Sequence, residues 1–527
     1  MLQTDAVVIG AGHNGLVCAF HLARAGLRVQ LLERRAVVGG AAVTEEFAPG
    51  FRNSTASYTV SLLSADVIRA MDLPRHGLRI VPRPEANFLP LEDGRYLLAG
   101  TATAAEFAKF SARDAQALPD YEAGLQRVAD VVRTLAGRIP PSGRGGPADL
   151  LGLVEAAAAA RGLSLADRRQ MLTLFTGSAA EFLSHWFESE PVQALFGFDS
   201  IVGTWASPFH PGTAYVLLHH VLGEVHGVRG AWGHAIGGMG AITQAMQRAC
   251  LDEGVAIATG AEVSRVLVVD GRARGVELAD GRLLAARLVI ANVGPKLLFG
   301  RLVPADALPP DFRAAIARFR TGSASFRMNV ALSGLPRFAA RPEPGPHLAA
   351  GILLAPSLAW MDRAFLQSRA DGLARDPIVE MLIPSLLDPT LAPPGMHVAS
   401  LFAQHFAPHL PDGRSWQDER DAAADAVLDV VERFAPGFRR LVIGQVALSP
   451  EDLEARFGLV DGDIFHGAMR LDQLWAARPV LGHGDYRTPI EGLWLCGAGA
   501  HPGGGVTGLP GRNAARAILK ARRFRLR

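Results

Sequence analysis

The segment spanning residues 5–40, DAVVIGAGHNGLVCAFHLARAGLRVQLLERRAVVGG, constrains the fold more than any other part of the chain. An apolar run leads into Gly10-x-Gly12-x-x-Gly15, a helix-like stretch follows, and a second apolar run ends at Glu33. A glycine triplet placed between a strand and a helix, with an acid closing the next strand, predicts a Rossmann-like dinucleotide site. Gly10 permits the tight turn, Gly12 lets the backbone approach a pyrophosphate, and Gly15 lets the helix pack on the strand. A glycine-rich turn without a ligand is the alternative.

The acid at the end of the second apolar run bears on which dinucleotide is bound. Glu33 would accept hydrogen bonds from the hydroxyls of the adenosine ribose, and its charge would repel a 2′-phosphate, which disfavours NADP. The N–H groups at the start of the helix would face the phosphates. His13 and Asn14 occupy the variable positions of the triplet and belong to the same predicted site.

The same stretch contains no Asp, Glu, Lys or Arg from Ala6 to Ala23, so its hydropathy resembles that of a signal peptide or membrane span. Residues 1–4 carry no Lys or Arg, however, and no cleavage site follows. A secretory signal peptide needs a positively charged start and a cleavage site. We therefore interpret the segment as a folded element.

Composition narrows the class of protein. A chain of 527 residues is too long for one simple core and predicts two or three structural units. Its 53 cations nearly balance 51 anions, which gives no electrostatic case for nucleic acid binding. The last eight residues, KARRFRLR, predict a solvated basic tail, with peripheral contact to an anionic membrane surface as the alternative.

The three cysteines, Cys18, Cys250 and Cys496, lie far apart in the sequence and form no CxxC pair. Neither a thiol–disulfide redox centre nor a structural zinc site is indicated, and no other metal-ligand spacing is present. We expect a cytoplasmic protein without a bound metal.

The middle of the chain alternates between helical and β-type patterns. Residues 64–136 are mostly helical in pattern, a Gly- and Pro-rich surface connection covers 137–148, and residues 149–225 are helical again. From residue 254 short β-type runs begin, and two Asp-Gly dipeptides separate the last three of them. These signals predict a three-stranded meander that ends at Asn292. Between residues 300 and 477 we expect strands at FRMNVAL and HVASLFAQHF and a helix at WQDERDAAADAVLDVVERF.

A second glycine cluster lies near the end of the chain, with six glycines in the twelve residues 497–508. It stands between a strand-like run, LWLC, and a helix-like run. This placement predicts a second close backbone approach to the same cofactor, ending in another helix N-terminus. A helix end there would stabilise negative charge on a reduced flavin ring, which favours FAD over NAD. A flexible glycine hinge is the alternative.

These motifs, taken together, resemble the phytoene desaturase-like family of FAD-dependent oxidoreductases. The match is nearest to its pyridine nucleotide-disulfide oxidoreductase domain-containing branch, with carotenoid desaturases and retinol saturases as relatives. The resemblance rests on VVIGAGHNGLVCAFHLARAG, LLERRAVVGGAAVTEE, NSTASYTVSLL, RGAWGHAIGGMGAI, GDIFHGAMRLDQLWAARP and LWLCGAGAHPGGGVTGLPGRNAA. The segment WFESEPVQALFGFDSIVGTWASPFHPGTAYVLLHH and the meander extend the match along nearly the whole chain.

The resemblance implies an α/β fold, with a discontinuous Rossmann-like FAD-binding domain and a mixed sheet and helical substrate domain, as in the amine oxidase and phytoene desaturase superfamily. It also implies a set of FAD-binding residues: Gly10, Gly12, His13, Asn14, Gly15, Glu33, Arg34, Gly39, Gly40, Ala41, Val263, Asn292, Gly497, Gly499, Gly505 and Val506. The FAD-binding domain is expected at residues 1–65, 228–300 and 478–527. The substrate domain, with a helical insertion, is expected at residues 66–227 and 301–477.

One departure from the family pattern concerns the substrate. Carotenoid desaturases usually lack His-Asn inside the first glycine triplet, and here His13 and Asn14 occupy it. This difference argues against a true phytoene desaturase.

A flavin dehydrogenase needs little acid–base apparatus, because the protein mainly orients the substrate and excludes water. Four residues are candidates for a catalytic role: His234 beside the GGMG segment, His466 in GDIFHG, His501 in the last glycine cluster, and Tyr58. Each has a group that can donate a hydrogen bond or act as a base. Other isolated histidines are expected to be packing or surface residues.

The leading hypothesis is an enzyme that takes a hydride from a small hydrophobic substrate and produces a C=C bond or an isomerised polyene. An amine-oxidase-like enzyme that forms an imine, a regulatory flavoprotein without turnover, and a nicotinamide dehydrogenase are the alternatives. Only one complete glycine–acid unit is present, so reoxidation by oxygen, a quinone or another acceptor is favoured over a tightly held nicotinamide. The sequence leaves the substrate, the acceptor and the oligomeric state open.

Overall fold

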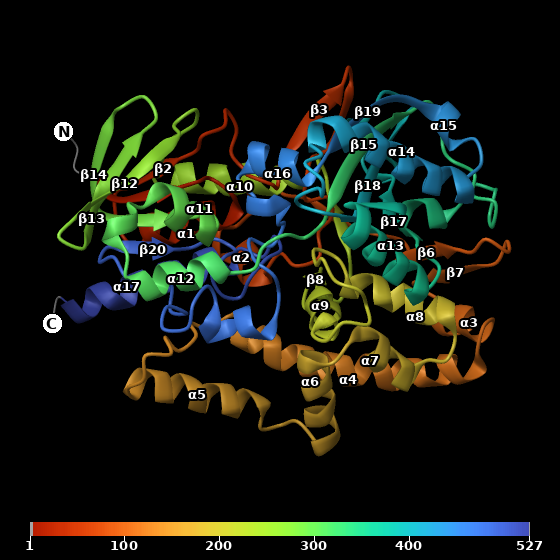
Figure 1. Cartoon of the computed structure of the whole chain (residues 1–527), viewed down its shortest axis with the longest axis horizontal. Coiled ribbons are helices and arrows are strands. Elements are labelled where there is room, and N and C mark those ends of the chain that lie inside the picture. The colour runs from red at the N-terminus through yellow and green to blue at the C-terminus, as the bar shows by residue number, and fades with distance from the viewer. Residues whose placement is uncertain (1–3, 526–527) are drawn as a thin grey trace.

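The computed structural model of the chain describes residues 4–525 (Figure 1). The predicted strand–turn–helix–strand unit is present as β1 (Thr4–Ile9), α1 (His13–Arg24) and β2 (Val29–Leu32). It forms part of a seven-stranded sheet with the order β11 (Ala256–Ala258), β2, β1, β14 (Leu283–Ala291), β13 (Arg272–Leu278) and β12 (Val263–Val269), with β20 (Leu493–Leu495) paired to β14.

The strands around β1 run parallel, and β1 lies between two neighbours from distant parts of the chain. It pairs with β2 through Ala6–Ile9 on one side and with the last residues of β14 on the other. β14 in turn pairs in parallel with β20. The carboxyl ends of β1 and β14 therefore form a topological switch point, where open α/β sheets bind their ligands.

The predicted three-stranded meander is confirmed. β12, β13 and β14 pair in antiparallel fashion, and the first part of β14 makes these pairs before the strand enters the parallel sheet. At the first hairpin Asp270 and Gly271 have φ angles of 50° and 68°. Positive φ at both central residues is what a two-residue hairpin turn requires.

A second seven-stranded sheet is mixed and has the order β19 (Val442–Leu448), β15 (Phe326–Leu332), β18 (His397–Phe406), β17 (Leu373–Leu382), β16 (Gly351–Leu354), β6 (Asn87–Pro90) and β7 (Tyr96–Ala99). β15 and β18 coincide with the predicted strands FRMNVAL and HVASLFAQHF. Every residue of β15 is buried. The buried residues of β15 include two polar ones, Arg327 and Asn329.

The expectation of a mostly helical pattern between residues 64 and 136 is wrong for part of that stretch. β5 (Ile80–Pro82), β6 and β7 lie within it. These strands span three or four residues, too few to show alternation, and β6 pairs with the distant β16. The Asp93-Gly94 dipeptide between β6 and β7 is the hairpin signal that could have revealed two of them.

The stretches with a helical pattern contain helices. The helix predicted at WQDERDAAADAVLDVVERF is α14 with the same bounds. The longer helices are α4 (Ala112–Ala136), α5 (Pro147–Ala160), α6 (Leu165–Thr176), α7 (Ala179–Trp186), α8 (Glu190–Gly197), α9 (Thr213–His220), α10 (Met239–Asp252), α12 (Pro310–Arg318), α13 (Leu358–Asp371), α14 (Trp416–Phe434), α16 (Pro450–Phe457) and α17 (Leu509–Arg525). Of these, α12, α13 and α16 are further helices between residues 300 and 477, where only one was expected. Shorter ones are α2 (Ala65–Ala70), α3 (Thr103–Ala108), α11 (Pro295–Leu297) and α15 (Phe438–Leu441). Three further two-stranded ribbons pair β3 (Thr44–Ala48) with β4 (Phe51–Ser54), β8 (Glu224–Val225) with β9 (Val228–Arg229), and β5 with β10 (Gly233–Ala235).

Each large sheet has its own apolar core. The first sheet and both chain ends lie on the left of Figure 1, the second sheet lies at the upper right, and α4 to α7 run along the bottom. The two cores do not follow the expected domain boundaries. Val67 and Phe312, which fall in the expected substrate domain, pack in the core of the first sheet. The domain division stays a prediction.

None of the helices within residues 4–525 is long and apolar enough to cross a membrane. The final residues of the predicted basic tail, Leu526 and Arg527, lie outside the described residues. The proposed contact of that tail with a membrane surface stays a prediction.

Candidate active site

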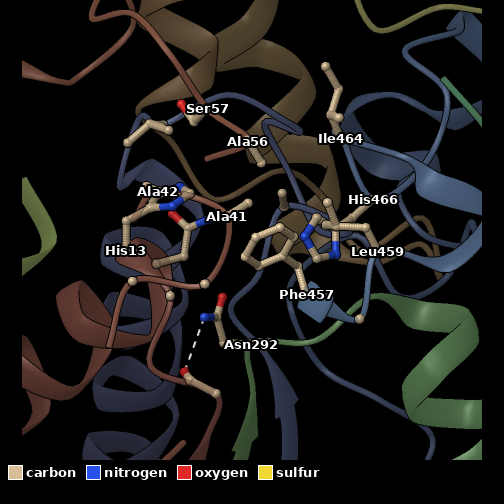
Figure 2. Close-up of a pocket in the computed structure, with 18 of the residues that line it drawn as sticks. His13, Ala41, Ala42, Ala56, Ser57, Asn292, Phe457, Leu459, Ile464 and His466 are labelled. Atoms are coloured by element: carbon tan, nitrogen blue, oxygen red, sulfur yellow. Dashed lines mark hydrogen bonds between the residues drawn. The ribbon is translucent and has the colours of Figure 1, made fainter. Parts of the chain in front are cut away.

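A cavity of about 440 Å³ opens at the carboxyl ends of β1 and β14, between the two large sheets (Figure 2). Thirteen of the sixteen residues predicted to bind a dinucleotide line it: Gly10, Gly12, His13, Asn14, Glu33, Arg34, Gly39, Gly40, Ala41, Val263, Asn292, Gly505 and Val506. They come from both ends of the chain and from the meander. The fold thus gathers the two glycine clusters around one cavity.

The other three predicted residues, Gly15, Gly497 and Gly499, lie behind the wall of this cavity. A Cβ at Gly15 would stand 2.2 Å from the carbonyl oxygen of Gly10, and one at Gly499 would stand 2.2 Å from Cδ of Pro295. A Cβ at Gly497 would lie 3.2 Å from the carbonyl carbon of Asn292. These glycines let backbone segments pack closely enough to shape the cavity.

The acid at the end of β2 is positioned by backbone groups. Glu33 is buried, and its two carboxylate oxygens accept hydrogen bonds from the backbone N–H of Ala11 and of Arg35, each at 2.9 Å. The backbone carbonyl of Glu33 accepts a third bond from Ala261 N–H, at the start of the meander. Each carboxylate oxygen has more than one acceptor site, so Glu33 keeps capacity toward a ligand in the cavity.

The phosphate region predicted from the glycine triplet fits a dinucleotide pyrophosphate. α1 begins after Gly12 without a side-chain cap, and its first turn contains no acidic residue. Gly12 forms a parallel bridge with Gly39, and a Cβ at Gly40 would lie 3.4 Å from Cα of Gly12. An uncapped helix N-terminus beside a surface of bare backbone is a site for an anion.

Two polar side chains project near these loops. Asn292 Nδ2 donates a hydrogen bond of 3.1 Å to the carbonyl of Gly10, drawn as a dashed line in Figure 2, and so fixes the turn. His13 Nε2 is buried and has no hydrogen-bond partner in the structure. Burial lowers the pKa of His13 to about 4, so the ring is neutral at pH 7. A buried nitrogen without a protein partner is what a bound polar group would satisfy.

On the opposite wall of the cavity, His466 is the one residue that was predicted from the sequence as a candidate. Phe457, Leu459 and Ile464 line the cavity with His466, and Figure 2 shows them facing His13 and Ala41 across it. His466 has a φ angle of 56°, and burial lowers its pKa to about 4. Ile464 and His466 lie in the GDIFHG motif, whereas Phe457, the last residue of α16, and Leu459 just after it belong to no motif.

A buried arginine ties this wall to the second glycine cluster. The guanidinium of Arg478 donates to the carbonyl of Ala498 at 2.9 Å and 3.0 Å, and to the carbonyls of Phe465 and Gly467 at 2.9 Å and 3.1 Å. Arg478 is 0% exposed. Hydrogen bonds to charged donors are the stronger ones, and here they hold two loops of the cavity together.

The far end of the cavity, toward the second sheet, is lined by aromatic rings, among them Tyr58, Trp232 and Phe402. Tyr58 stacks on Phe402 with ring centroids 5.3 Å apart. Arginine guanidinium groups cover these rings from outside: Arg327 lies 4.5 Å from the Tyr58 centroid, and Arg83 lies 5.4 Å from the Trp232 centroid.

One carboxylate lies among these groups. Glu380 accepts a hydrogen bond of 2.5 Å from the hydroxyl of Tyr58, and its other oxygen lies 3.7 Å from Nη1 of Arg83. Burial raises the pKa of Glu380, against the opposing effect of both arginines. Burial raises the pKa of Asp199, which is electrostatically coupled to Glu380 and Arg83, to about 8. At pH 7 Asp199 is therefore protonated, and the two arginines face at most one carboxylate, that of Glu380.

Two of the four predicted catalytic residues, Tyr58 and His466, line the first cavity, and the other two do not. His234 Nε2 lies 3.2 Å from Asp388, whose carboxylate also accepts from Gly237 N–H and from Thr390. Burial opposes ionisation of Asp388, but these hydrogen bonds hold its pKa well below its usual range. This pairing gives His234 a structural role, and its catalytic role stays a prediction.

His501 lines a second cavity of about 380 Å³, between α2, the end of α4 and the second glycine cluster. Its Nε2 donates to the carbonyl of Leu135 at 3.0 Å. The two cavities share Leu62 and Leu63 in their walls. The catalytic role of His501 also stays a prediction.

Two of the three cysteines are neighbours in the folded chain. Cys18 and Cys496 lie far apart in the sequence, but the structure brings their side chains into hydrogen-bond contact. Both are fully buried and free, and burial raises the pKa of the Cys496 thiol. A buried thiol with a raised pKa is inert as a nucleophile.

Comparison with known proteins gives a family and relatives for the whole chain. A family model described as "Flavin containing amine oxidoreductase" matches residues 15–328. The "Pyridine nucleotide-disulfide oxidoreductase domain-containing protein 2" of Mus musculus is 42% identical, over 98% of this chain and 94% of that protein.

Two more distant likenesses are a curated relative and a solved structure. The "Phytoene desaturase (lycopene-forming)" of Pseudescherichia vulneris is 28% identical over 97% of this chain and 98% of that protein. The solved structure of "Cyclohexylamine Oxidase" from Brevibacterium oxydans IH-35A has a TM-score of 0.60 at 16% identity, covering 99% of this chain and all of that one. The second likeness concerns the fold alone, and it agrees with the predicted superfamily architecture.

Proposed function

The chain belongs to the flavin containing amine oxidoreductase family and is an FAD-dependent oxidoreductase, and from that premise we propose that its substrate is a neutral, hydrophobic molecule rather than an amine. FAD, when bound, supplies the hydride acceptor for the oxidation. The reaction we propose is a dehydrogenation or desaturation, with oxygen, a quinone or another acceptor reoxidising the cofactor.

The observation that carries this proposal is the occupation of the aromatic wall by the protein's own cations. An aromatic cage binds a substrate ammonium through the faces of its rings. Here Arg327 lies over Tyr58 and Arg83 over Trp232, with centroid distances of 4.5 Å and 5.4 Å. A substrate cation would approach rings whose quadrupoles already interact with two buried guanidinium groups.

The charge of this region adds to the same argument. With Asp199 protonated at pH 7, the two guanidinium groups of Arg83 and Arg327 face at most one carboxylate, that of Glu380, so the group has a net positive charge. A like charge is disfavoured in a site of low dielectric constant. Neutral substrates meet no such penalty, and the apolar rings of the wall would bury their hydrocarbon surface.

In such a reaction the protein's own residues bind the cofactor, orient the substrate and exclude water. The backbone of the glycine loops and Glu33 hold the cofactor, and Arg478 keeps the loops of the cavity together. The rings of Tyr58, Trp232 and Phe402 orient the substrate and exclude water. His13 and His466 are neutral at pH 7 and can act as hydrogen-bond donors at the cavity wall.

The test is anaerobic mixing of the purified, flavin-loaded protein with four probes, following bleaching of the flavin absorbance near 450 nm. Limonene and phytoene represent neutral isoprenoid hydrocarbons, and cyclohexylamine and putrescine represent amines. We expect reduction by at least one hydrocarbon and none by the amines. Reduction by the amines alone would favour the amine-oxidase alternative, and no reduction by any probe would favour a regulatory flavoprotein.

A further inference from the structure

Tyr58 stands at the boundary between the cavity and a buried polar network. Its ring lines the cavity, while its hydroxyl donates a 2.5 Å hydrogen bond to Glu380. Glu380 comes from β17, a strand of the second sheet, and 322 residues separate it from Tyr58 in the sequence. Its side chain is 4% exposed. The carboxylate therefore reaches the cavity through the tyrosine.

Two arginines and the Tyr58 hydroxyl surround Glu380 and stabilise a negative charge on its carboxylate. Arg83 lies 3.7 Å from Glu380 and donates to Thr59 Oγ1 at 2.6 Å, which fixes its guanidinium. Arg327 lies over the Tyr58 ring and donates to Ser400 at 2.6 Å, and its Nε and Nη1 are buried without partners. Asp199 is the remaining titratable group coupled to this network.

The 2.5 Å hydrogen bond between Tyr58 and Glu380 joins two groups whose pKa values are both raised by burial. Burial, helped by the Glu380 charge, raises the pKa of Tyr58 well above its usual value, so the phenol stays protonated when no substrate is present. Burial also raises the pKa of Glu380, which makes the carboxylate a stronger base than an exposed one. Groups whose proton affinities are shifted together at a cavity wall are candidates for acid–base work.

We propose that Tyr58 and Glu380 form a proton-accepting pair, in which the Tyr58 oxygen takes the proton lost by the substrate and passes its own proton to Glu380. This inference rests on the proposed function, because it assigns the second hydrogen of the same dehydrogenation. Tyr58 is the catalytic residue and Glu380 acts through it.

The step balances without a further reactant. One C–H bond of the substrate breaks and its hydrogen leaves with both electrons to the cofactor. The neighbouring C–H bond breaks and its electron pair becomes the new C=C π bond, while its proton goes to the Tyr58 oxygen. The Tyr58 O–H bond breaks at the same time, and that proton forms the O–H bond of neutral Glu380. Arg83 and Arg327 keep their charges throughout.

The test compares the flavin-loaded wild type with Tyr58→Phe, Glu380→Gln and Glu380→Asp in the same anaerobic mixing experiment. The probe is limonene, or phytoene if only phytoene reduces the wild type. We expect Tyr58→Phe and Glu380→Gln to lower the limiting rate of flavin reduction roughly 100-fold or more, with the half-saturating probe concentration nearly unchanged. Glu380→Asp, which keeps a carboxylate, should recover part of the rate. Tyr96→Phe is the matched control, because Tyr96 lies at the second sheet away from the cavity.

The pH profile separates a proton-accepting role from a structural one. Glu380 must be ionised to accept a proton, so the wild-type rate should fall as the pH drops through its raised pKa. In Tyr58→Phe this fall should disappear, whereas a variant that only loosened packing would keep it.

The variants also allow a readout without any substrate. The chain has five tyrosines, so ¹³C-tyrosine NMR can follow each phenol in a pH titration. Glu380→Gln removes the negative charge beside Tyr58 and should lower the pKa of that phenol, while the other four stay unchanged. A Tyr58 pKa unaffected by Glu380→Gln would overturn the pair.

The outcomes distinguish this inference from the proposed function. If limonene or phytoene reduces the wild type and Tyr58→Phe equally fast, the pair is overturned and the proposed function stands. If neither hydrocarbon reduces the wild type, the proposed function fails and the pair falls with it. If Glu380→Gln does not fold, Tyr58→Phe and its pH profile decide the question alone.

Discussion

The two walls of the first cavity bind by different means. The wall that belongs to the first sheet offers mainly backbone, with glycines at Gly10, Gly12, Gly39 and Gly40 and an uncapped helix end. The wall toward the second sheet offers side chains, with aromatic rings backed by buried arginines and Glu380. A backbone site tolerates almost no added atoms, whereas a side-chain site can change its chemistry one residue at a time. The cofactor end of such a cavity is therefore constrained, and the substrate end is adaptable.

The sharpest way to break the first wall is to add one methyl group. Gly15→Ala would place a Cβ 2.2 Å from the carbonyl oxygen of Gly10, a backbone atom that cannot move without opening the turn. Overpacking of this kind costs about 3 kcal/mol, so we expect FAD affinity to fall roughly 100-fold. Fluorescence titration of the deflavinated protein with FAD measures this affinity. Gly300→Ala is the control, since a Cβ there meets nothing within 4 Å. Purification of Gly15→Ala with a full complement of FAD would show that close packing of the turn is not required.

A smaller change tests the acid in the same wall. Glu33→Gln keeps the size of the side chain but puts an NH₂ group against the backbone N–H of Ala11 or of Arg35. One lost buried hydrogen bond costs about 1–3 kcal/mol, and we expect FAD affinity to fall roughly tenfold in the same titration. Glu277→Gln, which alters an exposed ion pair with Arg265 in the meander, should leave the affinity unchanged. Equal effects of the two substitutions would remove Glu33 from the site.

The smallest expected effect lies in the second wall. Arg327→Met removes the guanidinium over Tyr58, so the ring no longer interacts with a cation of the protein and can attract a substrate cation in the cavity. A cation–π contact is worth about 0.5–2 kcal/mol, so cyclohexylamine should bind roughly fivefold more tightly, with FAD affinity unchanged. Equilibrium binding of cyclohexylamine, followed by perturbation of the flavin spectrum, measures the change. Arg363→Met is the control, because Arg363 is an exposed residue of α13 that lies over Trp360, and neither residue lines the cavity. If Arg327→Met also lowered the FAD affinity, the two walls would not act independently.

The sequence predicted the first wall well because local chemistry specifies it. A glycine turn, the helix that follows and the acid after the next strand lie within about one βαβ unit, so their relation is set by short-range geometry. The helix α14 and the strands β15 and β18 were recognised for a similar reason, since the helical periodicity of α14 and the β-type composition of the two strands are complete within each segment. The short strands β5 to β7 escaped recognition because pairing with distant strands, more than their own pattern, makes them strands.

The second wall could not be predicted in the same way. Tyr58 was recognised as a candidate, but Glu380, Arg83 and Arg327 carry no motif, and each is an ordinary residue of a strand or of a loop next to one. Their relation to Tyr58 exists only after the second sheet has formed, because it joins positions as far apart as 58 and 380. The two histidines in glycine-rich segments, His234 and His501, show the converse case, since proximity in sequence to a cofactor motif did not bring them to the cavity.

By itself the sequence predicted a dinucleotide site between two glycine clusters, because the absence of side chains at fixed spacings is a local property that does not depend on the tertiary arrangement. The tertiary structure decided which side chains line the other end of the cavity. Burial and the pairing of distant strands place two arginines, a carboxylate and a tyrosine at one end of the cavity, and their charges and proton affinities arise from that proximity rather than from any residue alone.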